Sequence, residues 1–167
     1  MLAIRIAATS LLVATAALAA PMNPVLFQDL HWRLVGPFRG GRVLAVSGVP
    51  GEPGHFYFGS VNGGVWESTN AGRTWRPIFD SMPVGSIGAL AVAPSNPRVI
   101  YAGTGEADMR SDIAQGKGVY RSDDGGATWR FAGLAETQQI GSIQVDPHDA
   151  NVAWVAASNS PFTTSIG

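Results

Sequence analysis

The sequence contains no cysteine and a single lysine, Lys117. Without cysteine, a disulfide, a thiolate metal site and a cysteine nucleophile are all excluded. Charge of either sign is also scarce, with 11 basic and 12 acidic side chains and a net charge of −1. No basic patch large enough to neutralise several phosphates is visible, and nucleic acid is not an expected partner.

The one long apolar run lies at the amino terminus, from Ile6 to Leu18, behind a single positive charge at Arg5. Small residues at positions 17 and 19 suit a signal peptidase, so we predict a signal peptide over residues 1–19, cleaved after Ala19. A membrane anchor is the alternative, but the run is too short to span a bilayer comfortably. We therefore expect a secreted or periplasmic chain with no membrane span after cleavage.

An eight-residue pattern, Ser-x-Asp/Asn-x-Gly-x-Thr-Trp, occurs twice, at 68–75 and 122–129. The two copies lie 54 residues apart, near the length of one four-stranded propeller blade. Each follows an alternating run and predicts a hairpin turn, in which the Asp or Asn side chain accepts backbone N–H groups and the Gly takes a positive φ. The Thr-Trp pair is expected to open the return strand, because these residue types suit a pleated surface.

The rest of the unit repeats as well, since residues 87–103 align with 140–156 and, more loosely, with 43–59. Each copy contains an apolar strand, a turn and a second apolar strand. We predict an all-β fold, an incomplete β-propeller of about two and a half four-stranded antiparallel blades, with strands near 43–46, 56–59, 64–68, 74–76, 89–92, 99–103, 119–122, 128–130, from 140, and 152–156.

On these residues the chain resembles the Asp-box (bacterial neuraminidase repeat) β-propellers. Within them it is similar to the secreted bacterial proteins of the sortilin N-terminal-domain and xyloglucanase-like group, through residues 32–42, the loop at 103–106 and the two boxes. The resemblance covers roughly Leu30 to Ala157. It implies that the box residues are structural and lie away from the ligand face: Ser68, Asn70, Gly72, Thr74, Trp75, Ser122, Asp124, Gly126, Thr128 and Trp129.

The predicted organisation is a linker at 20–29, a partial propeller at 30–157 with a short strand around Trp32, and an irregular tail at 158–167. A closed propeller has at least about four blades, and each repeat relies on a neighbour to bury its apolar face. We therefore hypothesise that the chain is a fragment of a longer product, truncated near Ala157. Its open sheet edge predicts aggregation or assembly with a partner, the remaining blades of the parent propeller being the first candidate.

The best candidate for chemistry is the loop at 103–117, which holds Glu106, Asp108 and Asp112. Paired carboxylates serve glycoside hydrolysis as acid and nucleophile or base. They also ligate calcium, although the spacing lacks the Gly and terminal Glu of an EF-hand loop. The plain alternative is a solvated loop with a local pair between Asp108 and Arg110. No catalytic residue, cofactor or metal is assigned.

Other polar and aromatic residues have structural interpretations. Arg39 and Arg42 flank a Gly-Gly turn and suit either an anion or, more simply, neighbouring carbonyls. The histidines have no Ser or Cys companion and give no triad; they are His31, His55 and His148. The tryptophans are expected to pack between blades rather than to stack on sugars: Trp32, Trp66, Trp75, Trp129 and Trp154.

Two functions from different classes follow. The favoured one, implied by the sortilin resemblance, is an exported scaffold that binds a protein or glycan ligand in its full-length parent. The alternative is a piece of a carbohydrate-active glycoside hydrolase of the xyloglucanase-like type, without a complete active site in this chain. Fold analogy alone does not decide between them.

Overall fold

The computed structural model describes residues 23, 25, 41–108 and 112–158. The chain divides into two units, Met1–Val35 and Gly36–Gly167. In the first unit the Asn23 side chain accepts a hydrogen bond from the Val25 amide, 3.0 Å away. The predicted signal peptide, the strand around Trp32, Arg39, Arg110 and the tail after Ser158 lie outside the described residues.

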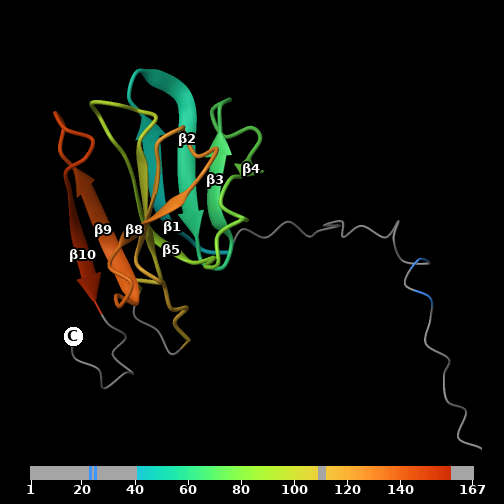
Figure 1. Cartoon of the computed structure of the whole chain (residues 1–167). Coiled ribbons are helices and arrows are strands. Elements are labelled where there is room, and N and C mark those ends of the chain that lie inside the picture. Colours follow the sequence, from blue (N-terminus) through green and yellow to red (C-terminus); the bar gives the residue numbers. More distant parts are fainter. Residues whose placement is uncertain (1–22, 24, 26–40, 109–111, 159–167) are drawn as a thin grey trace, which may run out of the picture. The chain divides into compact units, whose positions relative to one another are not determined.

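The described part of the second unit consists of ten antiparallel strands and contains no α-helix (Figure 1). Two four-stranded sheets, β1-β2-β3-β4 and β5-β6-β7-β8, are followed by the pair β9-β10. We call them blades one, two and three. The fold is therefore an all-β partial propeller, with strands at Val43–Val49 (β1), Glu52–Ser60 (β2), Gly64–Ser68 (β3), Arg76–Pro77 (β4), Ile87–Val92 (β5), Ile100–Thr104 (β6), Val119–Ser122 (β7), Arg130–Gly133 (β8), Gln139–Val145 (β9) and Ala153–Ser158 (β10).

The ten strands occur where the sequence predicts them, with one consistent shift. The return strands begin at Arg76 and Arg130, not at the Thr-Trp pairs. The reason lies in the turn, where the amides of Thr74 and Thr128 donate to the side chains of Asn70 and Asp124 at 2.9 and 2.8 Å. A residue whose amide is bound inside the turn is not available to the sheet ladder.

Both copies of the repeated turn share the hydrogen bonds that the serine hydroxyl and the Asn or Asp side-chain oxygen accept from backbone amides. The hydroxyl of the first serine accepts the glycine amide, over 2.9 Å in the Ser68 copy and 2.8 Å in the Ser122 copy. The glycines have φ values of 79° and 90°, a region that other residues enter at a cost. The repeated sequence thus encodes a turn that closes on its own side chains.

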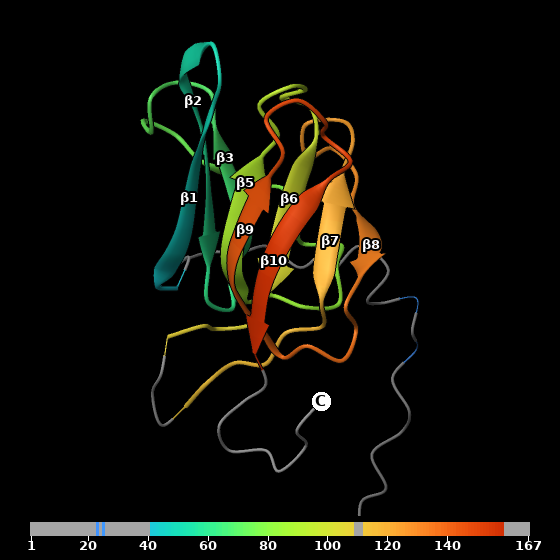
Figure 2. The ribbon, with the colours of Figure 1, turned by 90° about the vertical axis from the view of Figure 1, so that its left-hand side faces the viewer.

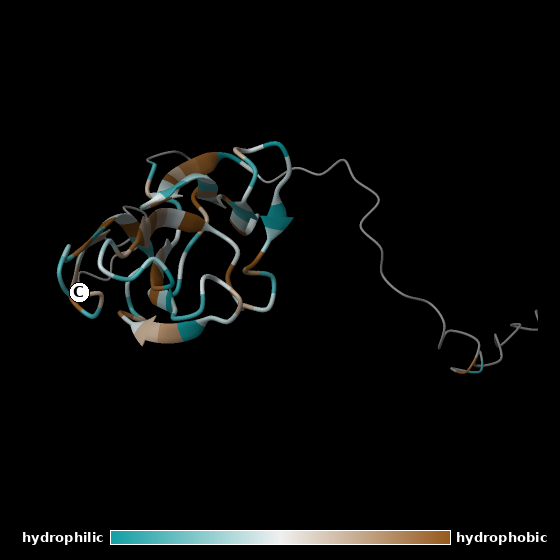
Figure 3. Cartoon of the chain, turned by 90° about the horizontal axis from the view of Figure 1, so that it is seen from above, coloured by the Kyte–Doolittle hydropathy of each residue, from teal (hydrophilic) through white to brown (hydrophobic). Residues whose placement is uncertain are grey.

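Successive blades pack face to face, through equivalent residues each time (Figure 2). Gly59 on β2 lies close to Ile87 of blade two, and Gly103 on β6 lies equally close to Ile140 of blade three. Two buried clusters fill the two boundaries, one centred on Tyr57, Ile100 and Tyr120, the other on Tyr101 and Ile143. Figure 3 shows apolar stretches on the strands, whereas many connecting loops are polar or neutral.

The two outer flanks of this stack expose residues that are buried at the inner boundaries. Tyr57 and Tyr101 face the next blade and are 1% and 6% exposed, whereas their counterpart Trp154 is 58% exposed. On the opposite flank, Val46 is 66% exposed although its counterpart Leu90 is 9% exposed. Blades one and three therefore present faces of the kind that blades use to pack on one another.

The described tryptophans follow the prediction of packing between blades only at Trp129. Its ring lies 5.0 Å from that of Phe79, across the first boundary. Trp66 and Trp75 instead surround Phe58 within blade one, with ring distances of 6.0 and 4.6 Å. Trp154 departs from the prediction because its side chain is exposed on β10, where no further strand is described.

Candidate functional site

The three carboxylates of the acidic loop between β6 and β7 lie in different surroundings. Glu106 is buried, whereas Asp108 and Asp112 are exposed. Among the described residues, no group of three or more His, Cys, Asp or Glu side chains has a metal-binding arrangement. The pair between Asp108 and Arg110 lies partly outside the described residues.

Glu106 has a clear role in holding this loop. Its side chain forms an ion pair with Arg42, which precedes β1. Its second carboxylate oxygen accepts the Ala114 amide at 3.2 Å, and its own amide donates to the Ala114 carbonyl at 2.8 Å. A buried carboxylate is stabilised when a guanidinium and a backbone amide both donate hydrogen bonds to it. Arg42 therefore binds a carboxylate of its own chain rather than the carbonyls that the sequence suggested.

A second polar cluster, missed from the sequence, lies on β2 and β3. His55 is hydrogen bonded through Nδ1 to Glu52 at 2.8 Å and through Nε2 to Glu67 at 2.9 Å. Glu67 is buried and forms an ion pair with Arg76. It also accepts a hydrogen bond from the Tyr57 hydroxyl, over 3.4 Å. Burial, followed by the charge and hydrogen bonding of Glu67, raises the pKa of Tyr57. The Glu-x-x-His spacing of Glu52 and His55 was the signal available in the sequence.

The cavity beside this cluster is small, about 100 Å³, and is lined by Glu67, Thr69, Thr74, Trp75 and Arg76. Small-ligand sites usually have roughly 300–1,000 Å³. Because the acid is already paired with His55 and Arg76, the cluster is best explained as a buried ionic network that joins β2, β3 and β4.

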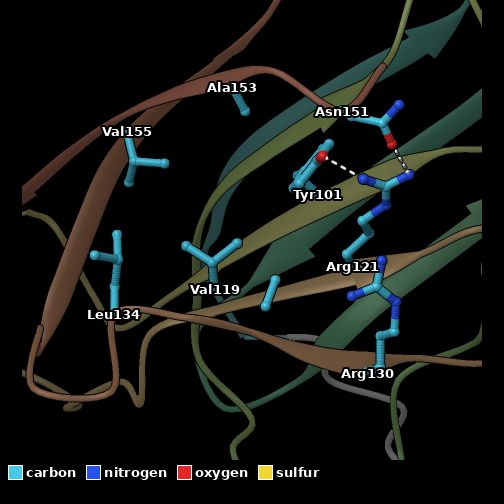
Figure 4. A pocket seen from close by; sticks show the side chains of 9 residues that line it. Tyr101, Val119, Arg121, Arg130, Leu134, Asn151, Ala153 and Val155 are labelled. Atoms are coloured by element: carbon cyan, nitrogen blue, oxygen red, sulfur yellow. Dashed lines mark hydrogen bonds between the residues drawn. The ribbon is translucent and has the colours of Figure 1, made fainter. Parts of the chain in front are cut away.

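A second cavity is a cleft of about 270 Å³ between blades two and three (Figure 4). One wall is polar and centres on Arg121, whose guanidinium donates to the Tyr101 hydroxyl at 2.8 Å and to the Asn151 side chain at 2.9 Å. The other lining residues are Val119, Arg130, Ala132, Leu134, Ala153 and Val155.

The charges around the cleft are largely neutralised. Asp123 accepts hydrogen bonds from Arg121 at 2.7 Å and from Arg130 at 3.2 Å. Slight burial opposes ionisation of Asp123, but these two arginines outweigh it and lower its pKa. In the adjoining turn, hydrogen bonds from Thr128 and Ser122 lower the pKa of Asp124 to about 2. Paired arginines leave this cleft without a strong anion-binding character.

The remaining candidates have local roles. The His148 amide donates to Asp146 in the β9–β10 turn, at 2.7 Å. His31 lies outside the described residues. No helix in the described part of the chain is long and apolar enough to cross a membrane.

No protein-family model matches the chain. Among curated proteins, it is 34% identical over 87 residues to a xyloglucanase from Paenibacillus sp and 29% identical over 118 residues to a xyloglucanase from Hypocrea jecorina (strain QM6a). These matches cover 48% and 62% of the chain but only 8% and 13% of the relatives. The chain thus corresponds to a small part of these enzymes.

Solved structures give the same picture. An ancestral GH74 enzyme matches with a TM-score of 0.56 and 27% identity, over 68% of this chain and 16% of its own. The GH74 xyloglucanase from Xanthomonas campestris matches with a TM-score of 0.54 and 28% identity, over 74% of this chain and 20% of its own. Both support the assignment as a partial propeller.

Proposed function

We propose that this chain is a propeller segment of a GH74-like glycoside hydrolase that acts on xyloglucan. The observation that carries the proposal is the agreement of two independent comparisons, since curated relatives and structural neighbours above 25% identity are both xyloglucanases or GH74 enzymes. This agreement favours the alternative reached from the sequence over the sortilin-like scaffold. The repeated turns at 68–75 and 122–129 are proposed to be Asp boxes, as their residue pattern suggests.

Within such an enzyme we assign this segment a supporting role rather than the catalytic acid or base. Glu106 and Glu67 are both buried in ion pairs with arginines. A general acid or nucleophile has to reach the glycosidic bond, and neither carboxylate has that freedom. The proposed role is to position loops on a rigid scaffold, as propeller blades do.

The proposed location follows from the amino terminus. We propose that the segment is exported and cleaved after Ala19, as the apolar run and the small residues at 17 and 19 suggest. Mass spectrometry of the protein from the periplasm or medium of an expressing bacterium is expected to give a chain that starts at Ala20. A chain that retains Met1 in those fractions would contradict the cleavage.

The enzymatic assignment is tested with residues 20–167, which we call the full exported chain, and with purified xyloglucan. Affinity electrophoresis in xyloglucan gels is expected to retard the chain, with no retardation in gels of an unbranched β-1,4-glucan of similar size. An assay for new reducing ends is expected to stay at background. Equal mobility in both gels would contradict xyloglucan recognition, and release of reducing ends would contradict the supporting role.

A further inference from the structure

We propose that Asn62 is a site of spontaneous deamidation, in which the backbone nitrogen of Gly63 attacks the Asn62 side chain. The site is the turn between β2 and β3, and the proposal does not depend on the proposed enzymatic activity. The products are free ammonia and a carboxylate at position 62, in the form of aspartate or isoaspartate.

The turn offers both reacting groups side by side. The chain contains a single Asn-Gly pair, at 62–63. Asn62 is exposed and has a φ of 57°, in the left-handed region. Gly63 has no Cβ, so no side chain of its own shields its nitrogen from Cγ of Asn62. The pair therefore combines an accessible carboxamide with an unhindered nucleophile.

The Gly63 amide takes no part in the hydrogen bonds that hold the turn. Gly63 lies outside the β2–β3 ladder. The Val61 amide donates to the Arg42 carbonyl at 2.9 Å, and the Gly64 amide donates to the Gly85 carbonyl at 2.7 Å. Within the described part of the chain, no acceptor is hydrogen bonded to the Gly63 amide. Its nitrogen can therefore lose its proton to solvent without breaking a bond of the fold.

The Asn62 side chain is polarised by Ser86, which belongs to the connection between blades one and two. The Ser86 hydroxyl donates to Oδ1 of Asn62 at 2.9 Å and accepts the Asn62 amide at 3.0 Å. Ser86 is 1% exposed, so the donor is fixed in place. Negative charge develops on Oδ1 when a nitrogen attacks Cγ, and a preorganised donor at that oxygen lowers the barrier. Ser86 thus favours the reaction at this one carboxamide.

The other described asparagines lack this combination. Asn70 and Asn151 precede amides that donate to main-chain carbonyls, at 2.8 and 3.1 Å. Asn23 and Asn96 precede proline, whose nitrogen carries no hydrogen. A bound amide, or one without a proton to lose, is a poor nucleophile, and we expect these four asparagines to persist.

The one Asp-Gly pair of the chain, at 124–125, is also protected. The Gly125 amide donates to the Arg98 carbonyl at 2.8 Å. Hydrogen bonds from Thr128 and Ser122 lower the pKa of Asp124 to about 2. The carboxylate therefore stays ionised at neutral pH, and an anion resists attack by a nucleophile.

The reaction consumes one water and releases one ammonia. The Gly63 amide gives its proton to hydroxide as its nitrogen bonds to Cγ of Asn62. The Cγ–Nδ2 bond then breaks, and Nδ2 takes up a proton and leaves as ammonia. Water opens the resulting succinimide at either carbonyl, which gives aspartate or isoaspartate. Both products place a negative charge beside Ser86, and isoaspartate also lengthens the main chain of the turn by one carbon.

The test follows the full exported chain during incubation at mildly alkaline pH in heavy-oxygen water. Tryptic peptides are sequenced by electron-transfer mass spectrometry, which distinguishes isoaspartate from aspartate. We expect the oxygen label to enter at Asn62 at least tenfold faster than at Asn70, which lies in the same tryptic peptide, 43–73. Conversion of Asn62 no faster than that of Asn70 would overturn the proposal.

Variants separate the nucleophile from the donor. Gly63→Ala places a methyl group beside the attacking nitrogen and is expected to slow conversion at least tenfold. Ser86→Ala removes the donor to Oδ1 and is expected to slow it at least threefold, whereas Ser81→Ala, at an exposed serine of the same connection, is expected to leave it unchanged. Unchanged or faster conversion in Ser86→Ala would overturn the role of Ser86. If a variant fails to fold, the comparison of Asn62 with Asn70 in the unaltered chain still decides the proposal.

Discussion

The indole nitrogen of Trp129 donates a hydrogen bond to the main-chain carbonyl of Ile78, 2.7 Å away, across the boundary between blades one and two. The two residues are 51 positions apart, nearly the length of the repeat. Trp75 occupies the same place in the first turn but contacts Phe58 of its own blade. The tryptophan of the repeated turn therefore packs on its own blade in one copy and on the preceding blade in the other.

Replacement of Trp129 by alanine is expected to be among the most destabilising single changes in the chain. The side chain is 9% exposed, and truncation of a buried aromatic residue costs about 3–5 kcal/mol. Trp129→Phe is expected to lose less, because it keeps most of the packing and removes the hydrogen bond, worth about 1 kcal/mol. Urea unfolding followed by circular dichroism measures both.

The control for this change is Trp154→Ala. Trp154 is 58% exposed, so its truncation is expected to change the free energy of unfolding by no more than about 0.5 kcal/mol. Equal losses at Trp129 and Trp154 would contradict the packing described for the first boundary.

The close approach of successive blades requires glycine at two equivalent positions. A Cβ at Gly59 would lie 2.4 Å from Ile87, and one at Gly103 would lie 2.4 Å from Ile140. Either change to alanine is expected to destabilise the fold by about 1–3 kcal/mol through overpacking. Gly48→Ala is the matched control on a neighbouring strand, where the new Cβ meets Phe56 at an ordinary 3.5 Å. The unfolding temperatures of the three variants test this prediction. If Gly48→Ala lowered the unfolding temperature as much as the other two changes, overpacking at the blade boundary would not be the explanation.

The Asp124 carboxylate is expected to make stability depend on pH in acid. Its pKa is lowered from 3.8 to about 2 by hydrogen bonds from Thr128 and Ser122. A lowered folded-state pKa gives stability that is present above about pH 4 and is lost as the pH falls towards 2. Asp124→Asn is expected to reduce this loss, because Asn70 performs the same role without charge in the first turn. The urea midpoint, measured from pH 6 to 2 for both proteins, is the test, and parallel curves would exclude the contribution.

Glu106 is expected to act through stability rather than through catalysis. Glu106→Ala leaves the Ala114 amide without this acceptor and Arg42 without this partner. Loss of such a buried acceptor costs about 1–3 kcal/mol. The exposed Asp108→Ala variant is expected to unfold like the parent chain. Denaturant unfolding compares them, and an unchanged Glu106→Ala midpoint would show that the ion pair does not hold the loop.

Local patterns were sufficient for the strands and for the interior of the turns. Alternating apolar residues placed β3 at its observed bounds, and the Asp/Asn and Gly positions gave the turn acceptors and the positive φ. These features depend on neighbours within a few residues, which a repeated pattern reports directly. The start of the return strands was wrong because the hydrogen bonds to Asn70 and Asp124 keep the Thr-Trp pairs inside the turn.

Contacts between residues that are far apart in the sequence could not be predicted from local patterns. Arg42 and Glu106 are 64 residues apart, and their pairing depends on how two blades stack. The His55 and Glu67 pair depends on strand register, which shifts every side chain to the other face when it slips by one residue. The carboxylates of the loop at 103–117 share a short stretch of sequence, yet Glu106 points inward while Asp108 is exposed. Proximity in sequence therefore did not predict the burial of each carboxylate.

The central claim is that blade two is enclosed by its neighbours, whereas no described strand pairs with the outer edge of β10 in blade three. Hydrogen exchange of the full exported chain, followed by mass spectrometry, tests this most directly. Amides of β6, which pairs with β5 and β7, are expected to exchange slowest, and those of β10 are expected to exchange much faster. Equal protection of β6 and β10 would contradict the claim, because it would require a partner strand already paired along the edge of blade three.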